Sequence, residues 1–206
     1  MPKTNLTASA VLLLAFVAPA AAPAQEAGRD LRLGFRLGAF EMVNSPDSYD
    51  AVYGDPMPLL GVHLEGRVWR RLFLQASLDY GQVDGERVLP GVGIDTTLTY
   101  IPLHTAASWR LTGPAEAGRW EVRAGLGPSF LSWEDDGGVA SADGTEVGAN
   151  VVLSVLRLGQ RWHFGGEVRW STFPDAVGGD GPTVTNLFDE DDLGGLSVSF
   201  LALRGF

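Results

Sequence analysis

The residues of this sequence that could do chemistry are nine charged side chains embedded in otherwise apolar segments. They are Arg32, Arg36, Glu65, Arg67, Asp79, Glu121, Arg123, Glu167 and Arg169. In three segments a glutamate is followed two positions later by an arginine, and residues two apart share one face of an extended strand. Charges held out of bulk water are costly unless they are paired. The pattern therefore predicts a network of Arg–carboxylate ion pairs on one face of a sheet, with a structural or a gating role.

Catalytic and metal-binding patterns are weak by comparison. Nucleophilic catalysis needs a serine or cysteine beside a histidine that an acid orients. The sequence has no cysteine, and none of its histidines (His63, His104 and His163) stands in a His-x-Ser motif. His63 with Glu65 is the best acid–base pair, and no two histidines have metal-ligand spacing on one strand. We therefore expect no enzymatic activity, no cofactor and no metal site.

The elements that must position the charged residues are eight segments in which apolar and polar residues alternate with a period of two, as in half-buried strands. The segments span residues 31–39, 60–68, 72–80, 96–111, 120–130, 146–157, 163–170 and 196–206. Pro102 and Pro128 fall inside two of them and weaken the expected register there, because proline cannot donate to a strand ladder. After the N-terminus no apolar run is long enough for a spanning helix.

Short and long connections alternate between these segments. Three connections are short, at 70–71, 112–118 and 158–161, and four are long, at 43–58, 81–95, 134–146 and 172–195. An even number of strands, with short turns at one end and long loops at the other, is typical of bacterial outer-membrane barrels. The predicted fold class is therefore all-β, an eight-stranded antiparallel up-and-down transmembrane β-barrel.

A soluble lipocalin-like barrel would alternate in the same way, with its apolar face inside. Three features favour the membrane, and one of them is the aromatic residue Phe206 that closes the final strand. The polar face is rich in glycine and serine, which suits a crowded barrel interior. Aromatic residues also cluster at both strand ends, as interfacial girdles do. They are Trp69, Trp109, Trp120, Trp162 and Phe206 at the short-turn end, and Phe40, Tyr80, Phe130, Trp133, Trp170 and Phe173 at the long-loop end.

The N-terminus has the pattern of a secretory signal peptide. Lys3 precedes an apolar stretch at 10–18, and Ala22-Pro23-Ala24 fits a cleavage site. We expect residues 1–24 to be removed, and residues 25–206 to form one barrel domain with no room for a further domain. The net charge of the 206-residue chain is −10, which argues against a nucleic-acid-binding protein.

The chain resembles the small outer-membrane β-barrel proteins of the OmpA/OmpX/OmpW type. The resemblance rests on the segments 98–103 (LTYIPL), 123–128 (RAGLGP) and 194–206, and it covers essentially the whole mature chain. It implies a monomer in the outer membrane of a Gram-negative bacterium, in contact with outer-membrane lipid and lipopolysaccharide. It also implies recognition by the barrel-assembly machinery through the C-terminal strand that ends at Phe206. Arg204 departs from the family pattern, in which an apolar residue or tyrosine is usual.

Charge is sorted along the predicted barrel. Most of the 25 acidic residues lie in the long connections, whereas arginines cluster at the short turns. The family topology places the acidic loops outside the cell and the basic turns in the periplasm. One hypothesis is that residues 189–192, with Asp135 and Asp136, bind Ca²⁺ or bridge divalent cations to lipopolysaccharide. The favoured alternative is a set of hydrated loops that resist aggregation.

Three functions are compatible with this pattern. The favoured one is an integral outer-membrane barrel with a structural or surface-interaction role, its lumen plugged by Arg–carboxylate pairs. The first alternative is a narrow, OmpW-like, porin-like conduit for small solutes, and a more remote one is an enzyme that modifies lipid A. The face assignment predicts that Leu37→Arg, facing lipid, is more harmful than Gly38→Ser, facing inward.

Overall fold

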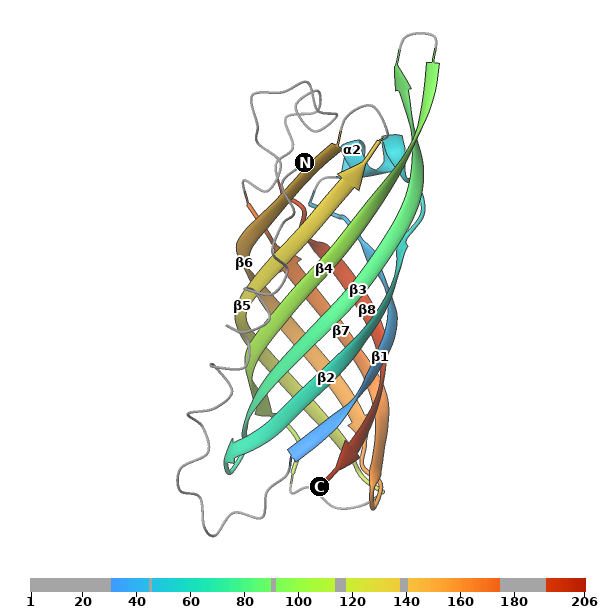
Figure 1. Ribbon diagram of the computed structural model, residues 1–206. Helices are drawn as coiled ribbons and strands as arrows, with labels where there is room; N and C mark the ends of the chain where they lie inside the picture. Colours follow the sequence, from blue (N-terminus) through green and yellow to red (C-terminus); the bar gives the residue numbers. More distant parts are fainter. Residues whose placement is uncertain (1–30, 45, 90–91, 114–117, 138–140, 175–191) are drawn as a thin grey trace.

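In this computed structural model, eight antiparallel strands close into a barrel (Figure 1). Each strand is hydrogen-bonded to the next one along the chain, and the last strand is hydrogen-bonded to the first. The structure describes residues 31–44, 46–89, 92–113, 118–137, 141–174 and 192–206, so the expected signal peptide lies outside the described residues. The strands are β1 (Leu31–Glu41), β2 (Met57–Trp69), β3 (Leu72–Leu89), β4 (Val92–Arg110), β5 (Trp120–Asp136), β6 (Ser141–Arg157), β7 (Trp162–Thr172) and β8 (Gly195–Gly205). The predicted all-β up-and-down architecture is confirmed.

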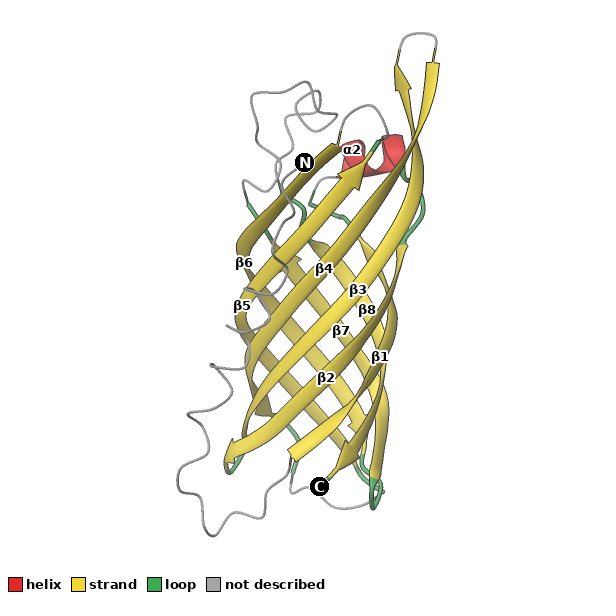
Figure 2. Ribbon diagram, in the orientation of Figure 1, coloured by secondary structure: helices red, strands yellow, loops and turns green. Residues whose placement is uncertain are grey.

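A short helix, α2 (Pro46–Val52), lies between β1 and β2 at the long-loop end (Figure 2). It has seven residues, and in the described ranges no helix has the length and apolarity needed to cross a membrane.

Two of the four long connections predicted from the sequence are wrong. The segments 81–95 and 134–146 are mostly strand, because β3 and β4 pair as far as Leu89 and Val92, and β5 and β6 as far as Asp136 and Ser141. Valine favours extended backbone, and the segment 81–95 contains three valines. The result is a protruding sheet at the long-loop end, made of residues 82–89, 92–99, 132–136 and 141–148 (Figure 1).

The two prolines interrupt the ladders without shifting the register. On the β3–β4 side, pairing stops after Leu78–Leu103 and resumes at Gly81–Tyr100, on either side of Pro102. The β4–β5 ladder has a similar gap beside Pro128. Asn150 of β6 reaches this second gap, and its Nδ2 donates to the carbonyl oxygens of Thr105, Gly127 and Pro128 at 3.0, 3.0 and 3.2 Å. The side-chain amide thus supplies donors beside a residue that has none.

The barrel wall is apolar outside, and its inward face carries the buried charged residues. On β1, Phe35 and Leu37 are 64% and 62% exposed, whereas Arg32 and Arg36 are each 2% exposed. The same alternation continues round the barrel, where the exposed hydrophobic residues are leucine, valine and aromatic side chains. This is the reverse of a soluble barrel, and it follows directly from the period of two.

The aromatic girdle at the long-loop end is smaller than the sequence predicted. The five aromatic residues assigned to the short-turn end are exposed, as are Tyr80, Phe130 and Trp170 at the other end. Phe40, Trp133 and Phe173 are instead buried inside the barrel. They share the strand parity of the inward residues, so their side chains point into the barrel.

Candidate functional site

Five charged residues form a lower ion cluster inside the barrel, near the short-turn end. They are Arg32, Glu65, Arg110, Glu121 and Arg123, and all are buried. Arg32 bridges the two glutamates, with Nη1 3.0 Å from Glu65 Oε1 and 2.8 Å from Glu121 Oε1. Arg123 Nη2 donates to Glu65 Oε2 at 2.6 Å, and Arg110 Nη1 to Glu121 Oε2 at 3.4 Å. The cluster therefore joins β1, β2, β4 and β5 across the lumen.

An aromatic ring supports the excess positive charge of this cluster. Phe73, fully buried at the start of β3, lies 4.7 Å from the guanidinium carbon of Arg123, measured to the ring centroid. The guanidinium carbons of Arg32 and Arg110 lie 5.6 and 6.0 Å from the same centroid. Cation–π attraction is strongest when the groups are out of water, so Phe73 offsets part of the repulsion among three arginines that share two glutamates.

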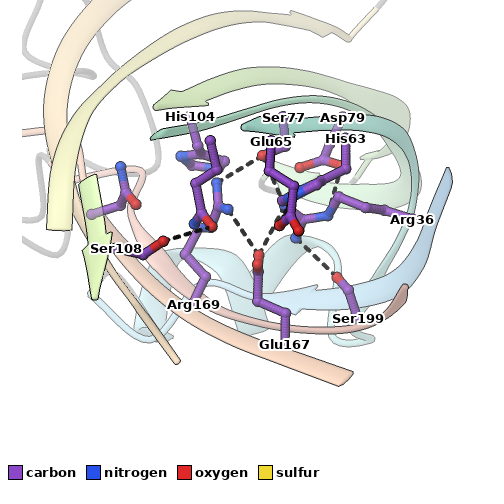
Figure 3. Close-up of polar contacts among 12 residues, drawn as sticks. Arg36, His63, Glu65, Ser77, Asp79, His104, Ser108, Glu167, Arg169 and Ser199 are labelled. Atoms are coloured by element: carbon purple, nitrogen blue, oxygen red, sulfur yellow. Dashed lines mark hydrogen bonds and ion pairs between the residues drawn. The ribbon is translucent and has the colours of Figure 1, made fainter. Parts of the chain in front are cut away.

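Four residues form an upper ion cluster nearer the middle of the barrel: Arg36, Asp79, Glu167 and Arg169 (Figure 3). Glu167 Oε1 lies 3.1 Å from Arg36 Nη1 and 2.8 Å from Arg169 Nη2, and Arg36 Nε lies 3.3 Å from Asp79 Oδ1. Ser77 and Ser199 add hydroxyl acceptors at 2.8 and 3.1 Å from Arg36. Two positive and two negative groups balance here.

The structure places eight of the nine predicted residues in this buried interior. The exception is Arg67, which is half-buried and lies next to a register shift between β2 and β3. Arg110 is one of the arginines that the sequence analysis grouped at the short turns, and it takes part in the lower ion cluster instead. Its neighbours Trp109 and Leu111 are both exposed, so strand parity was the signal that could have found it.

All three histidines are buried, and two of them join the polar interior. His63 Nε2 lies 3.1 Å from Glu65 Oε2, so the predicted acid–base pair lies against the lower ion cluster. A second pairing, missed by the sequence analysis, joins His104 Nδ1 and Ser129 Oγ at 2.7 Å across β4 and β5. Asn150 Nδ2 donates to the same hydroxyl at 2.8 Å, and Ser129 is fully buried. This arrangement satisfies polar groups inside the lumen, away from the outward face that would meet a lipid.

Above the ion clusters the lumen becomes apolar. The mouth cluster comprises Phe40, Met42, Tyr49, Met57, Leu59, Leu98, Tyr100, Leu131, Trp133, Phe173 and Leu193, all buried. The rings of Phe40 and Tyr100 stack with centroids 4.7 Å apart. Tyr49 attaches α2 to this cluster, and its hydroxyl donates to the carbonyl oxygen of Asp55 at 2.8 Å. Burial, with smaller contributions from nearby carboxylates, raises the pKa of Tyr49 to about 12.

The acidic residues of the described loops do not form a metal site. Among the described residues there is no group of three or more potential ligands that could hold a metal ion. Asp192 accepts hydrogen bonds from the backbone N–H groups of Phe173 and Gly194, both at 2.6 Å, and from the side chains of Thr172 and Asn44. It fixes the entry into β8 against the end of β7. Residues 189–191 of the hypothetical calcium site lie outside the described residues.

Comparison with known proteins bears on the fold. No protein-family model matches the chain, and no curated protein matches its sequence. The structure is similar to that of OprG, an outer membrane protein from Pseudomonas aeruginosa, with a TM-score of 0.55 and 10% identity over 86% of this chain and 95% of that one. It is also similar to Neisserial surface protein A, with a TM-score of 0.51 and 11% identity over 87% of this chain and 98% of that one. The chain therefore has the fold of small bacterial outer-membrane barrels.

Proposed function

We propose that the chain is an integral outer-membrane barrel with a closed interior and a surface-interaction role, its short-turn end in the periplasm. The observation that carries the proposal is the inversion of the wall, with leucine, valine and aromatic side chains exposed and paired arginine and glutamate side chains buried. In water such a wall would expose a continuous apolar surface, which is unfavourable. In a bilayer the same surface is covered by the hydrocarbon chains of the lipid. Outer-membrane lipid, lipopolysaccharide and the assembly machinery are the partners that this placement requires.

The stacking of three layers supports a closed interior. The lower ion cluster, the upper ion cluster and the mouth cluster follow one another along the axis, and α2 packs against the last of them. An eight-stranded barrel has an interior just wide enough for its side chains. A conduit would need these ion pairs to part, so measurable conductance would favour the OmpW-like alternative. An enzymatic role is not part of the proposal, because the Ser129–His104 pair is buried in the same interior.

The protruding sheet supports the surface-interaction role. Its exposed carboxylates include two pairs that stand directly opposite each other on neighbouring strands, Glu86 with Asp95 and Glu134 with Asp143. Like charges in such positions destabilise a sheet. Folding alone therefore does not explain them, whereas attraction of a basic partner outside the cell does.

A polylysine probe tests this surface on protein refolded into zwitterionic lipid vesicles. The variant Glu134→Gln/Asp143→Asn removes one opposed pair, and Asp50→Asn/Asp55→Asn removes the same charge from the β1–β2 connection. We expect the first variant to bind the probe several-fold more weakly and the second to bind almost as well as the wild type. Equal weakening would mean that net charge alone attracts the probe, and it would contradict a role for the sheet.

The proposed membrane insertion predicts that a charge on the outward face of β1 destabilises the folded barrel. Leu37→Arg should cost about 2–4 kcal/mol of folding free energy, because it places a cation near the bilayer midplane. Urea unfolding in vesicles, with heat-modifiable gel migration as the folding assay, measures this cost. If Leu37→Arg is as stable as the wild type, Leu37 does not face lipid.

The sequence predicts that Gly38→Ser is milder than Leu37→Arg, but the structure shows that Gly38→Ser introduces a clash of its own. A Cβ atom at Gly38 would clash with the carbonyl oxygen of Val198 and would lie 2.8 Å from Ser199 Cα. Backbone atoms cannot move aside as side chains do, so this substitution strains the β1–β8 seam. Gly38→Ser is therefore not the control for Leu37→Arg. Leu37→Ala, which leaves the outward face apolar, is the matched control.

A further inference from the structure

A groove on the outward face lies at the short-turn end, where the last residues of β8 meet β1, β2 and β7. Its cavity measures about 250 Å³ and is lined by Leu33, Gly34, Phe35, Val62, Trp162, Arg204 and Phe206. Every lining side chain but one is apolar. The groove thus offers one cation at the edge of a hydrophobic channel, on the face that the proposed function assigns to lipid.

Backbone hydrogen bonds hold this end of β8 in place. The N–H of Phe206 donates to the carbonyl oxygen of Leu31 at 2.9 Å, and the N–H of Gly205 donates to that of Arg161 at 2.9 Å. Phe206 is therefore held against β1, and Gly205 against the β6–β7 turn. A preformed groove loses little conformational freedom when a ligand enters it.

Arg204 is directed toward the rim of the barrel. It lies opposite Leu33 on one side and Trp162 on the other, and it is exposed. Its guanidinium carbon is 5.4 Å from the ring centroid of Phe206, the residue two positions nearer the end. In a bilayer, a side chain with this direction would place its guanidinium at the level of the lipid headgroups, while its methylene groups cover apolar surface. A guanidinium stays charged and can bind phosphate through two parallel hydrogen bonds.

The charges around the groove favour an anion. In the part of the chain that the structure describes, the exposed charged residues at this end are arginines: Arg70, Arg71, Arg119, Arg157, Arg161 and Arg204. The exposed carboxylates of the described residues lie at the opposite end, on the protruding sheet, at the end of β1 and on the β1–β2 connection. A ligand with a phosphate and an apolar chain matches both parts of the groove.

We infer that this groove binds an anionic phospholipid of the periplasmic leaflet, with an acyl chain along Leu33, Phe35 and Val62 and the phosphate on Arg204. The inference rests on the proposed membrane insertion. It also explains why an arginine stands at position 204, next to the last residue of β8: the cation anchors a lipid at the barrel seam, where β1 and β8 close the wall.

Native mass spectrometry of the refolded barrel tests this inference. The protein is inserted into vesicles of phosphatidylcholine and phosphatidylglycerol in equal amounts, extracted mildly, and the retained lipids are counted. We expect one phosphatidylglycerol to be retained in preference to phosphatidylcholine. Arg204→Gln should reduce that preference about fivefold, the factor that corresponds to ~1 kcal/mol of attraction per arginine near an anionic surface.

Two further variants sharpen the result. Arg71→Gln removes an exposed arginine from the β2–β3 turn and should keep the preference, whereas Val62→Trp fills the groove and should reduce retention while Arg204 is intact. Equal preference in wild-type protein and Arg204→Gln, or displacement of the lipid by inorganic phosphate alone, would overturn the inference. Failure of the wild type to insert into vesicles would instead contradict the proposed function.

Discussion

The ion clusters and the mouth cluster fill the same barrel by opposite means. In the lower ion cluster, buried charges hold one another through contacts as short as 2.6 Å between Arg123 and Glu65. In the mouth cluster, rings and aliphatic chains such as Phe40, Tyr100 and Met57 pack without charge. The stability of the ion clusters depends on matched charges, and that of the mouth cluster depends on side chains of matched volume. Substitutions that change only one of these properties should therefore affect one region and spare the other.

The largest effect is expected from Glu65→Gln in the lower ion cluster. The change nearly preserves volume but leaves Arg32, Arg110 and Arg123 with Glu121 as their carboxylate partner in the cluster. Breaking a buried ion pair by removing one partner costs about 3–5 kcal/mol. Urea unfolding of the refolded barrel measures the loss, with Glu134→Gln on the exposed sheet as a control that should change stability by less than about 0.5 kcal/mol.

The mouth cluster should respond to volume instead. Met57 is fully buried, so Met57→Ala should cost about 2–5 kcal/mol, because it leaves a cavity. Met57→Leu conserves volume and should cost less than about 1.5 kcal/mol. The same unfolding assay compares them. If Met57→Leu is as damaging as Glu65→Gln, the distinction between the two regions fails.

An intermediate effect is expected at Asn150, between the two regions. Asn150→Ala removes the donor to three carbonyl oxygens beside Pro128, which should cost about 1–3 kcal/mol because these acceptors lose a hydrogen bond inside the barrel. Asn150→Asp should cost more, since it turns a carboxylate toward those carbonyls. Stability equal to that of the wild type in both variants would show that the gap needs no side-chain donor.

The smallest effect is expected from a change of pH, through the ionisation of Tyr49 in the mouth cluster. Tyr49 has a pKa raised to about 12 by burial, above its ordinary value of 10.0. Its contribution to stability is therefore complete below pH 10 and is lost as the pH rises from there toward 12, because the unfolded chain ionises first. The free energy of unfolding of Tyr49→Phe should fall less over this range than that of the wild type. Parallel curves would contradict the burial of the hydroxyl.

Strand parity explains how much the sequence could predict. The alternation of Leu33 and Phe35 with Arg32 and Arg36 predicts the barrel, its two faces and most of the charged interior. The same rule applied to Phe40, Trp133 and Phe173 would have placed them inside, but the expectation of a girdle took precedence. Other features were beyond sequence reasoning, because they depend on contacts across strands that are distant in the chain. The Arg32–Glu121 pair and the donation from Asn150 to Thr105 are of this kind.

Single-channel conductance of the chain refolded into planar lipid bilayers tests the central claim, that the interior is closed. The protein should show the heat-modifiable migration of a folded barrel and no steady current. Glu65→Gln, if it still folds, should produce transient openings because the lower ion cluster has lost a carboxylate. Reproducible steady conductance of the wild type would contradict the account, since the ion clusters would then line an open path.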